Sequence, residues 1–327
     1  MSHARSTSSN PNATASAHKA AAVFHAAACS EFQEEDFLYD TGRPQEECGV
    51  FGIYAPGIEV ARRTFFGIFA LQHRGQESAG IAVSDRERIR HYSSLGLVSL
   101  VFTEDVLKEL PGEIAVGHNR YSTTGGNSSC NTQPILLESS DGPMALAHNG
   151  NLVNARELRQ GLEARGVVFS TTMDTEIMAK LIEEGRDKPL EEALLDMMAK
   201  VSGAYSVVMM TKDTLIAMRD PNGLRPLCLG KMIGSDDGYV VASETCALAP
   251  VGAELIREIE PGEIVFINGE GVESIHFIGD APGHSKRHSL CVFEFIYLAR
   301  PDSHLLGTNV HAARRRMGEL LSKQAPV

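Results

Sequence analysis

Short apolar runs recur along the chain from residue 48 onward, and most have the β-branched content or alternation typical of strands. The predicted strands cover residues 48–54, 80–83, 114–118, 144–148, 205–210, 215–219, 239–243 and 264–267. Three other segments repeat apolar residues at helical spacing and cover residues 62–71, 155–165 and 175–184. The pattern predicts a mixed protein in which strands outnumber helices.

Turn residues between the predicted strands favour antiparallel pairing. Pro-Asn-Gly at residues 221–223 and Asn-Gly-Glu-Gly at residues 268–271 each join two short apolar runs, as hairpin turns do. Strands joined by hairpins, with a few covering helices, indicate an α+β organisation rather than a regular βαβ alternation. Residues 303–321 become basic and helical, and we expect Arg314, Arg315 and Arg316 on a solvated helix face.

Composition and charge narrow the possible functions. The chain has 327 residues, of which 43% are hydrophobic and 22% charged, as in a folded globular protein of one large or two ordinary domains. Its net charge of -12 would repel nucleic acid and anionic lipid, so neither is expected as a partner. No membrane span is expected either, because the apolar runs are shorter than the roughly 18 to 20 residues that a spanning helix needs.

The first 47 residues are expected to form a disordered leader or propeptide. Residues 1–30 contain no Asp or Glu and are mostly Ser, Ala, Asn and Thr, so they cannot bury enough apolar surface to fold. The small residues at 20–29 leave open a secretory signal or an organelle transit peptide. We expect a cytoplasmic location, with an organelle such as the plastid as the alternative if the leader is a transit peptide.

The six cysteines are too sparse for a disulfide scaffold and form no C-x-x-C pair, which indicates a reducing compartment. Cys228 and Cys246 lie in apolar runs, where a thiol is usually an inert core residue. Cys48 differs because it stands where the leader gives way to the predicted fold. Cleavage after Glu47 would place a free α-amine, a base with a pKa of about 7.7 to 8.0, beside its thiol. Cys48 is therefore the candidate nucleophile.

Several ordered motifs then carry a family resemblance. They are residues 46–53 (Glu-Glu-Cys-Gly-Val-Phe-Gly-Ile), 71–77 (Leu-Gln-His-Arg-Gly-Gln-Glu), 117–123 (Gly-His-Asn-Arg-Tyr-Ser-Thr), 148–152 (His-Asn-Gly-Asn-Leu), 174–176 (Asp-Thr-Glu), 219–227 (Arg-Asp-Pro-Asn-Gly-Leu-Arg-Pro-Leu) and 294–303 (Glu-Phe-Ile-Tyr-Leu-Ala-Arg-Pro-Asp-Ser). Together they closely resemble the glutaminase domain of the amidophosphoribosyltransferase family. The first motifs are common to all N-terminal-nucleophile amidotransferases, whereas the Arg-Pro-Asp-Ser block points to the purine enzymes.

The resemblance implies a fold and a reaction. The implied fold is a four-layer αββα sandwich of two antiparallel sheets, the N-terminal-nucleophile hydrolase fold, in which removal of the propeptide exposes Cys48. Its thiolate would attack the side-chain amide of L-glutamine and form a γ-glutamyl thioester, which releases ammonia and is then hydrolysed. The ammonia would serve the first committed step of de novo purine biosynthesis.

The resemblance also assigns roles in binding glutamine. Arg120 would hold the α-carboxylate with its bidentate fork, Asp174 would accept the α-ammonium, and Thr123 would add a hydroxyl donor. The turn at Arg74 and Gly75 would close over the site. Taken singly, Asp174 also sits where a helix N-cap is wanted, and Arg120 could form a surface ion pair.

Two further residues are implied to stabilise the transition state. Asn149, through its side chain, and Gly150, through its backbone amide, would donate to the oxyanion of the tetrahedral intermediate. The same Asn-Gly pair is also common in hairpin turns.

No cofactor is expected for the glutaminase half. The resemblance implies cofactors only for the full-length enzyme. Family members with a Glu-Glu-Cys junction tend to hold a [4Fe-4S] cluster, and Cys291 would be one of four cysteine ligands, the other three lying in a second domain. That domain binds Mg²⁺ and 5-phosphoribosyl-1-pyrophosphate, and no loop of its kind occurs before Val327. His284 and His288 have metal-pair spacing but are assigned to a polar loop.

We therefore expect three parts: a leader at 1–47, a class II glutamine amidotransferase domain at 48–288, and a connecting segment at 289–327 that starts a truncated phosphoribosyltransferase domain. The full-length protein is expected to be a homo-oligomer. Two alternatives stay open. The chain could be an inactive or regulatory glutaminase-like module, or it could be the glutaminase half of another class II amidotransferase.

Overall fold

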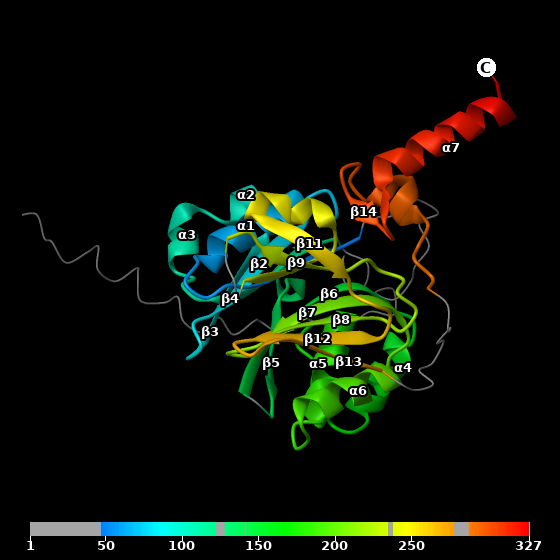
Figure 1. Ribbon diagram of the computed structural model, residues 1–327. Helices are drawn as coiled ribbons and strands as arrows, with labels where there is room; N and C mark the ends of the chain where they lie inside the picture. The colour runs from blue at the N-terminus through cyan, green and yellow to red at the C-terminus, as the bar shows by residue number, and fades with distance from the viewer. Residues whose placement is uncertain (1–46, 122–127, 141, 235–237, 278–287, 327) are drawn as a thin grey trace, which may run out of the picture.

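Two antiparallel β-sheets lie face to face at the centre of the protein (Figure 1). The structure is a computed structural model that describes residues 47–121, 128–140, 142–234, 238–277 and 288–326. The seven-stranded sheet has the order β11-β9-β10-β1-β4-β2-β3 and contains β1 (Gly49–Tyr54), β2 (Ser78–Ser84), β3 (Ile89–Leu95), β4 (Ile114–Arg120), β9 (Cys228–Met232), β10 (Tyr239–Ala242) and β11 (Ala253–Glu258). The six-stranded sheet has the order β13-β12-β8-β7-β6-β5 and contains β5 (Ile135–Ser139), β6 (Gly142–Leu152), β7 (Gly203–Met210), β8 (Leu215–Arg219), β12 (Glu263–Asn268) and β13 (Gly271–His276).

The alternation of side chains along each strand builds the layers. Val50 of β1 points inward and packs with Ala147 and Val208 of the opposite sheet in a fully buried apolar core. Phe51 and Ile53, on the other face of the same strand, belong to a second core beneath the helices. Because both faces of β1 are buried, the strand reads as a nearly continuous apolar run.

Helices cover the outer face of each sheet, which completes four layers (Figure 1). The seven-stranded sheet carries α1 (Val60–Ala70), α2 (Val98–Val101) and α3 (Glu104–Lys108), and the six-stranded sheet carries α4 (Ala155–Glu163), α5 (Asp174–Glu184) and α6 (Leu190–Lys200). Short 3₁₀ turns are η2 (Ser129–Asn131), η3 (Thr245–Ala247) and η4 (Ala249–Val251). Helix α1 lies close to its sheet at Gly67, where a Cβ atom would come within 2.4 Å of the Phe51 ring. Among the described residues, no helix combines the length and the apolar character needed to cross a bilayer.

The predicted strands and helices are present in the structure, but one of the two predicted hairpins is wrong. Residues 268–271 do join β12 to β13 in an antiparallel pair. Residues 221–223 instead carry the chain from β8 in one sheet to β9 in the other. The side chain of Asp220 accepts the backbone N–H groups of Asn222 and Leu224, both at 2.9 Å, and so fixes a turn that changes sheets.

The C-terminal segment packs against the sandwich at one end. It contains a π-helical turn, η5 (Glu294–Leu298), a small hairpin of β14 (His304–Leu305) and β15 (Thr308–Asn309), and helix α7 (Val310–Gln324), which extends away from the sheets (Figure 1). The backbone amides of Ser289 and Cys291 donate to the carbonyls of Asn222 and Leu224 at 2.9 and 3.1 Å. The domain boundary expected at residue 289 stays a prediction, although this segment is joined to the sandwich by these bonds.

The basic run on α7 is only partly the solvated face that its sequence predicts. Arg314 turns back toward η5 and donates to the carbonyls of Phe295 and Ala299, at 2.8 and 2.7 Å. Arg315 and Arg316 are exposed, as predicted, and pair with a carboxylate one turn along the same helix. The first of the three arginines therefore anchors the helix.

Candidate active site

Cys48 stands immediately before β1, the middle strand of the seven-stranded sheet. Its side chain is buried, with 5% of the residue exposed, and its Sγ lies 3.4 Å from the carbonyl oxygen of Tyr121. The neighbouring strands fix the start of β1, because Gly49 is paired with Asn119 of β4 and the amide of Val50 donates to Ser243 Oγ at 2.9 Å. The candidate nucleophile is therefore held at a rigid strand end.

Burial and two of the other predicted residues affect the ionisation of the Cys48 thiol. Burial raises the pKa of the Cys48 thiol to about 11, while the positive charge of Arg120 lowers this pKa and the negative charge of Asp174 raises it. Arg120 immediately precedes Tyr121, whose carbonyl oxygen contacts the sulfur. The roles of Arg120 and Asp174 in binding the two ends of a glutamine backbone stay predictions.

The residue that precedes Cys48 is also held in place. The Glu47 carboxylate pairs with the guanidinium of Arg225, and each side chain is nearly nine-tenths buried. Burial raises the pKa of Glu47, against the lowering effect of Arg225. The rest of the leader, residues 1–46, lies outside the described residues.

Asn149 and Gly150 lie in the middle of β6 rather than in a hairpin turn, so that structural alternative is wrong. They are paired with Ser206 and Tyr205 of β7. Both polar atoms of the Asn149 side chain are buried without a hydrogen-bond partner in the described structure, which is costly unless a ligand completes them. Gly150 has a φ of +145° and a Cβ there would lie 1.9 Å from the Ala204 carbonyl oxygen, so only glycine fits.

Two buried histidines connect this strand to its surroundings. His118 Nε2 lies 3.1 Å from the carbonyl oxygen of His148, which joins β4 of one sheet to β6 of the other. His148 Nδ1 in turn lies 3.3 Å from Thr175 Oγ1 and 3.6 Å from Asp174 Oδ1. The residue before Asn149 is thus fixed through its carbonyl and its side chain.

Asp174 is the first residue of α5, and its side chain does not cap that helix. Its Oδ2 instead accepts the backbone amide of Leu152 at 2.9 Å, which binds the start of the helix to the end of β6. The carboxylate is buried rather than exposed at a helix end. Its predicted contact with an ammonium group stays a prediction.

Arg120 ends β4 with 2% of its surface exposed, so the surface ion pair considered for it is wrong. Its Nη1 lies 3.8 Å from Glu77 Oε2. Gly75 packs directly on the backbone here, because a Cβ at that position would lie 2.6 Å from the Arg120 carbonyl carbon. Thr123, the remaining predicted glutamine contact, lies outside the described residues.

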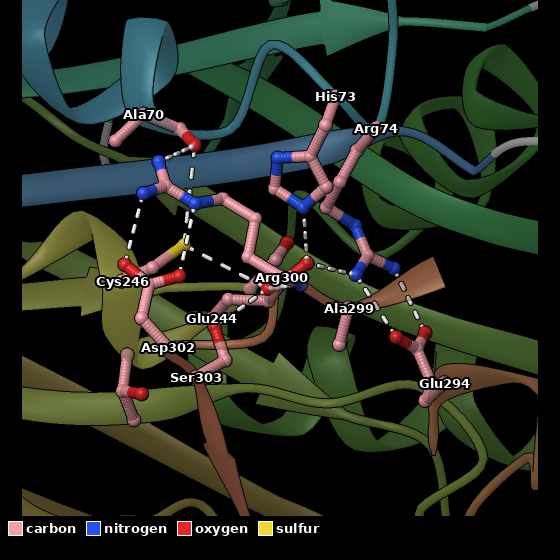
Figure 2. Close-up of polar contacts among 12 residues, drawn as sticks. Ala70, His73, Arg74, Glu244, Cys246, Glu294, Ala299, Arg300, Asp302 and Ser303 are labelled. Carbon is pink, nitrogen blue, oxygen red and sulfur yellow. Dashed lines mark hydrogen bonds and ion pairs between the residues drawn. The ribbon is translucent and has the colours of Figure 1, made fainter. Parts of the chain in front are cut away.

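Arg74 has a fully buried side chain, which points toward the carboxylates of Glu244 and Glu294 (Figure 2). Its Nε donates to the carbonyl oxygen of Cys48 at 3.1 Å, and its two terminal nitrogens bind the carboxylates of Glu244 and Glu294. The guanidinium is therefore occupied by protein acceptors. A glutamine contact through this side chain stays a prediction.

Comparisons with known proteins agree with this geometry. A family described as "Glutamine amidotransferase domain" matches residues 118–250. An amidophosphoribosyltransferase of Synechococcus elongatus is 49% identical over 289 residues, which make up 87% of this chain and 57% of that protein. One from Bacillus subtilis is 45% identical over 86% of this chain and 58% of its own length. The chain is a homologue of the amidophosphoribosyltransferases. It spans little more than half the length of these relatives.

Solved structures extend the homology to the fold. A structure described as the allosteric regulatory enzyme of purine biosynthesis matches with a TM-score of 0.79 and 44% identity, over 86% of this chain and 58% of its own. The glutamine phosphoribosylpyrophosphate amidotransferase of B. subtilis, complexed with ADP and GMP, matches with a TM-score of 0.78 and 43% identity, over 86% and 59% of the two chains. The predicted four-layer N-terminal-nucleophile fold is confirmed.

The metal prediction for this amidophosphoribosyltransferase homologue concerns one residue. Cys291 is partly buried near η5, and its backbone is bound to Leu224. Within the ranges described above, no group of three or more His, Cys, Asp or Glu side chains could hold a metal ion. One thiol does not fit a four-cysteine cluster by itself, so the cluster stays a prediction about the longer protein. His288 lines a pocket together with Arg257 and His304, and His284 is outside the described residues.

Two residues near the nucleophile, Glu244 and Glu294, were not predicted from the sequence to belong to the site. Glu244 and Glu294 contact Arg74 across 170 and 220 positions of the chain. An isolated Glu after a strand and a Glu in an apolar run have no local pattern that pairs them with a distant arginine. The clue available was that Glu294 lies in an otherwise apolar motif, where a carboxylate must find a partner.

Proposed function

We propose that this chain hydrolyses L-glutamine through a thioester on Cys48 and is the glutaminase half of an amidophosphoribosyltransferase. In the longer protein the released ammonia would be used to form phosphoribosylamine from 5-phosphoribosyl-1-pyrophosphate, the first committed step of de novo purine biosynthesis. The observation that carries the proposal is the buried, unpartnered amide of Asn149, next to a glycine whose conformation no other residue adopts at that place.

The chemistry begins with the bond between Glu47 and Cys48. In the uncleaved chain the thiol is buried and its pKa is about 11, so almost none of it is thiolate at neutral pH. Cleavage would replace the amide nitrogen of Cys48 with an α-amine whose pKa is about 7.7 to 8.0. That amine would take the thiol proton as the sulfur attacks the amide carbon of glutamine.

The described residues would have separate roles in binding the substrate and in stabilising the transition state. Arg120 would hold the substrate α-carboxylate and Asp174 the α-ammonium, because both are buried charged groups of the sign opposite to the group that each would bind, and both act on the Cys48 thiol. The Asn149 side chain and the amide of Gly150 would donate to the oxyanion as it forms. The thioester keeps the glutamyl group, the protonated amine donates a proton to the leaving ammonia, and water then releases glutamate.

Partners and location follow as proposals. L-glutamine is the substrate, a phosphoribosyltransferase domain is the partner that would use the ammonia, and the longer protein is proposed to be a homo-oligomer of the cytoplasm. Mg²⁺ and a [4Fe-4S] cluster would belong to that longer protein.

The direct test is glutamate release by the chain that begins at Cys48. We expect turnover of glutamine, its loss in Cys48→Ser, and its retention in Cys228→Ala, which removes another buried thiol of the same sheet. Glutamate release that persists in Cys48→Ser would refute the proposed mechanism. An electrophilic glutamine analogue should label position 48 and no other thiol.

The contact between Glu47 and Arg225 favours one second candidate, a regulatory module that keeps its leader. In that form Glu47 stays bonded to Cys48, and the thiol stays buried and un-ionised. Intact mass separates the two candidates. A species that begins at Cys48 supports the glutaminase, whereas a chain that keeps residue 47 under all conditions supports the regulatory module.

A further inference from the structure

A buried ion cluster joins Arg74 to Glu244 and to Glu294 of the C-terminal segment (Figure 2). Arg74 is at its centre and forms a bidentate pair with Glu294, in which Nη2 lies 2.8 Å from Oε1 and Nη1 lies 3.0 Å from Oε2. Nη1 also lies 2.6 Å from Glu244 Oε1. The third nitrogen of the guanidinium, Nε, donates to the carbonyl oxygen of Cys48 at 3.1 Å. One guanidinium thus connects both carboxylates to the backbone of the proposed nucleophile.

The Glu244 carboxylate accepts several further hydrogen bonds in the cluster. Its Oε1 accepts from His73 Nε2 at 2.8 Å, and its Oε2 accepts from the backbone amide of Arg300 at 2.9 Å and from Ser303 Oγ at 2.7 Å. The Glu244 side chain is fully buried. The carboxylate therefore binds the turn after α1 and the segment after η5 to the same point.

Stability alone is a weak reason for such an arrangement. Removing charges from water costs several kcal/mol per ion, and buried ion pairs can often be replaced by apolar residues without loss of stability. What a bidentate arginine pair does supply is orientation, because its planar fork fixes both partners. The orientation of Arg74 decides where its Nε points, and Nε contacts Cys48.

We propose that Glu294 and Glu244 are positioning residues for Cys48, acting through Arg74. They hold the guanidinium so that its Nε fixes the carbonyl of Cys48, and this keeps the thiol aligned with the bound amide and with Asn149. Docking of residues 294–303 is then a condition for glutamine hydrolysis. The proposal rests on the proposed function and adds two residues that do not touch the substrate.

The test uses the chain that begins at Cys48 and the variant Glu294→Gln, which keeps the size of the side chain but removes its charge and one of the two oxygens that accept from Arg74. We expect kcat for glutamine hydrolysis to fall about 10- to 100-fold, because a shift of about 1 Å at a reacting group can cost that much. KM should change less than threefold, since the substrate contacts are intact. Alkylation of Cys48 by iodoacetamide, which carries no glutamine groups, should slow as well.

Asp302→Asn is the matched control. Asp302 pairs with Arg300 in the same segment, but its side chain is exposed and does not contact Arg74. We expect wild-type kcat, KM and alkylation rate from this variant. The proposal is overturned if Glu294→Gln behaves like Asp302→Asn, or if it raises KM while leaving kcat unchanged.

A milder variant keeps the test decisive if Glu294→Gln does not fold. Ser303→Ala removes one hydroxyl donor from Glu244, and it should lower kcat several-fold without lowering the melting temperature by more than a few degrees. Unchanged kcat in a folded Ser303→Ala protein would also overturn the proposal. If the wild-type chain hydrolyses no glutamine, the proposed function fails, and the alkylation rates at Cys48 still decide whether the two carboxylates position it.

Discussion

His118 Nε2 lies 3.1 Å from the carbonyl oxygen of His148, so one hydrogen bond crosses from the seven-stranded sheet to the strand that carries Asn149. A carbonyl can only accept, which makes Nε2 the protonated nitrogen of the ring. Burial lowers the pKa of His118 to about 3, so the ring stays neutral at physiological pH. The bond between the sheets therefore does not change with pH around neutrality.

Replacing His118 should lower the stability of the protein, because this hydrogen bond is lost. His118→Phe leaves the carbonyl of His148 buried without a partner, and we expect the free energy of unfolding to fall by about 1–3 kcal/mol. Urea denaturation measures the change. His276→Phe, at an exposed histidine of β13, is the control and should change the free energy of unfolding by less than about 0.5 kcal/mol. Equal effects of the two variants would contradict the structural role.

Asn149 should show opposite effects on activity and on stability. Asn149→Leu removes the proposed oxyanion donor, and kcat should fall about 10² to 10³-fold with little change in KM. The same change removes two buried polar atoms that have no partner in the described structure, so the free energy of unfolding should stay the same or rise. Kinetics and urea denaturation on the same preparation provide both values. A fall of more than about 1 kcal/mol would indicate that the amide is satisfied in the folded protein.

Gly150 should tolerate no side chain. Gly150→Ala forces both a φ of +145° and an overlap with the Ala204 carbonyl oxygen, so the loss of stability should exceed the roughly 1–3 kcal/mol of backbone strain alone. Gly271 is a matched control, because its φ is +121° and a Cβ there would meet nothing within 4 Å. The difference between the two Gly→Ala variants in thermal denaturation measures the overlap. No difference would contradict the close pairing of β6 with β7.

The uncleaved chain should have an unreactive thiol. With the pKa of Cys48 raised to about 11 by burial, its alkylation by iodoacetamide should be slow at pH 7 and should accelerate up to about pH 11. An unfolded thiol titrates near pH 8.5, so the unfolded state loses its proton first and this group favours unfolding above that pH. Peptide mass mapping over a pH series follows the rate. Rapid labelling of position 48 at pH 7 before cleavage would contradict this environment.

Acid should weaken the ion cluster around Glu244. Burial by itself raises the pKa of this carboxyl, but the hydrogen bond from His73 and the charge of Arg74 outweigh burial and hold the pKa well below its usual value. The stabilisation is therefore present above about pH 4.5 and is lost as the pH falls below it. Urea denaturation between pH 3 and pH 7 should show a flatter dependence for Glu244→Gln than for the wild type. Parallel curves would show that Glu244 does not titrate abnormally.

Local pattern predicted most of the elements, and the failures have physical reasons. β3 was missed because its sequence, Ile-Arg-His-Tyr-Ser-Ser-Leu, has little apolar alternation at the edge of a sheet. Helix α6 was also missed, although Leu190, Leu194 and Met197 follow Pro189 at helical spacing, so its signal was present. The turn at residues 221–223 was wrongly predicted to be a hairpin, because a Pro-Asn-Gly turn can join two strands of one sheet or carry the chain from one sheet to the other.

Part of the site could likewise be predicted from local sequence motifs, and part of it could not. The nucleophile and the oxyanion residues lie in short motifs. Because these motifs match those of a known family, each residue could be assigned the role that it has in that family. The ion cluster is built from side chains that meet only after both sheets and the C-terminal segment have folded. Glu294 and Arg74 are 220 positions apart, and only the tertiary structure shows their contact.

The location of Cys48 beside a central strand has a consequence for the processed protein. A newly created chain end usually frays, because its first residues lack neighbours on one side. Here β4 and β10 flank the first strand on both sides, so its amide hydrogens should exchange with solvent as slowly as those of the sheet interior. The α-amine of the new amino terminus would then be held in a fixed position, as the side chains of residues in the interior of a fold are.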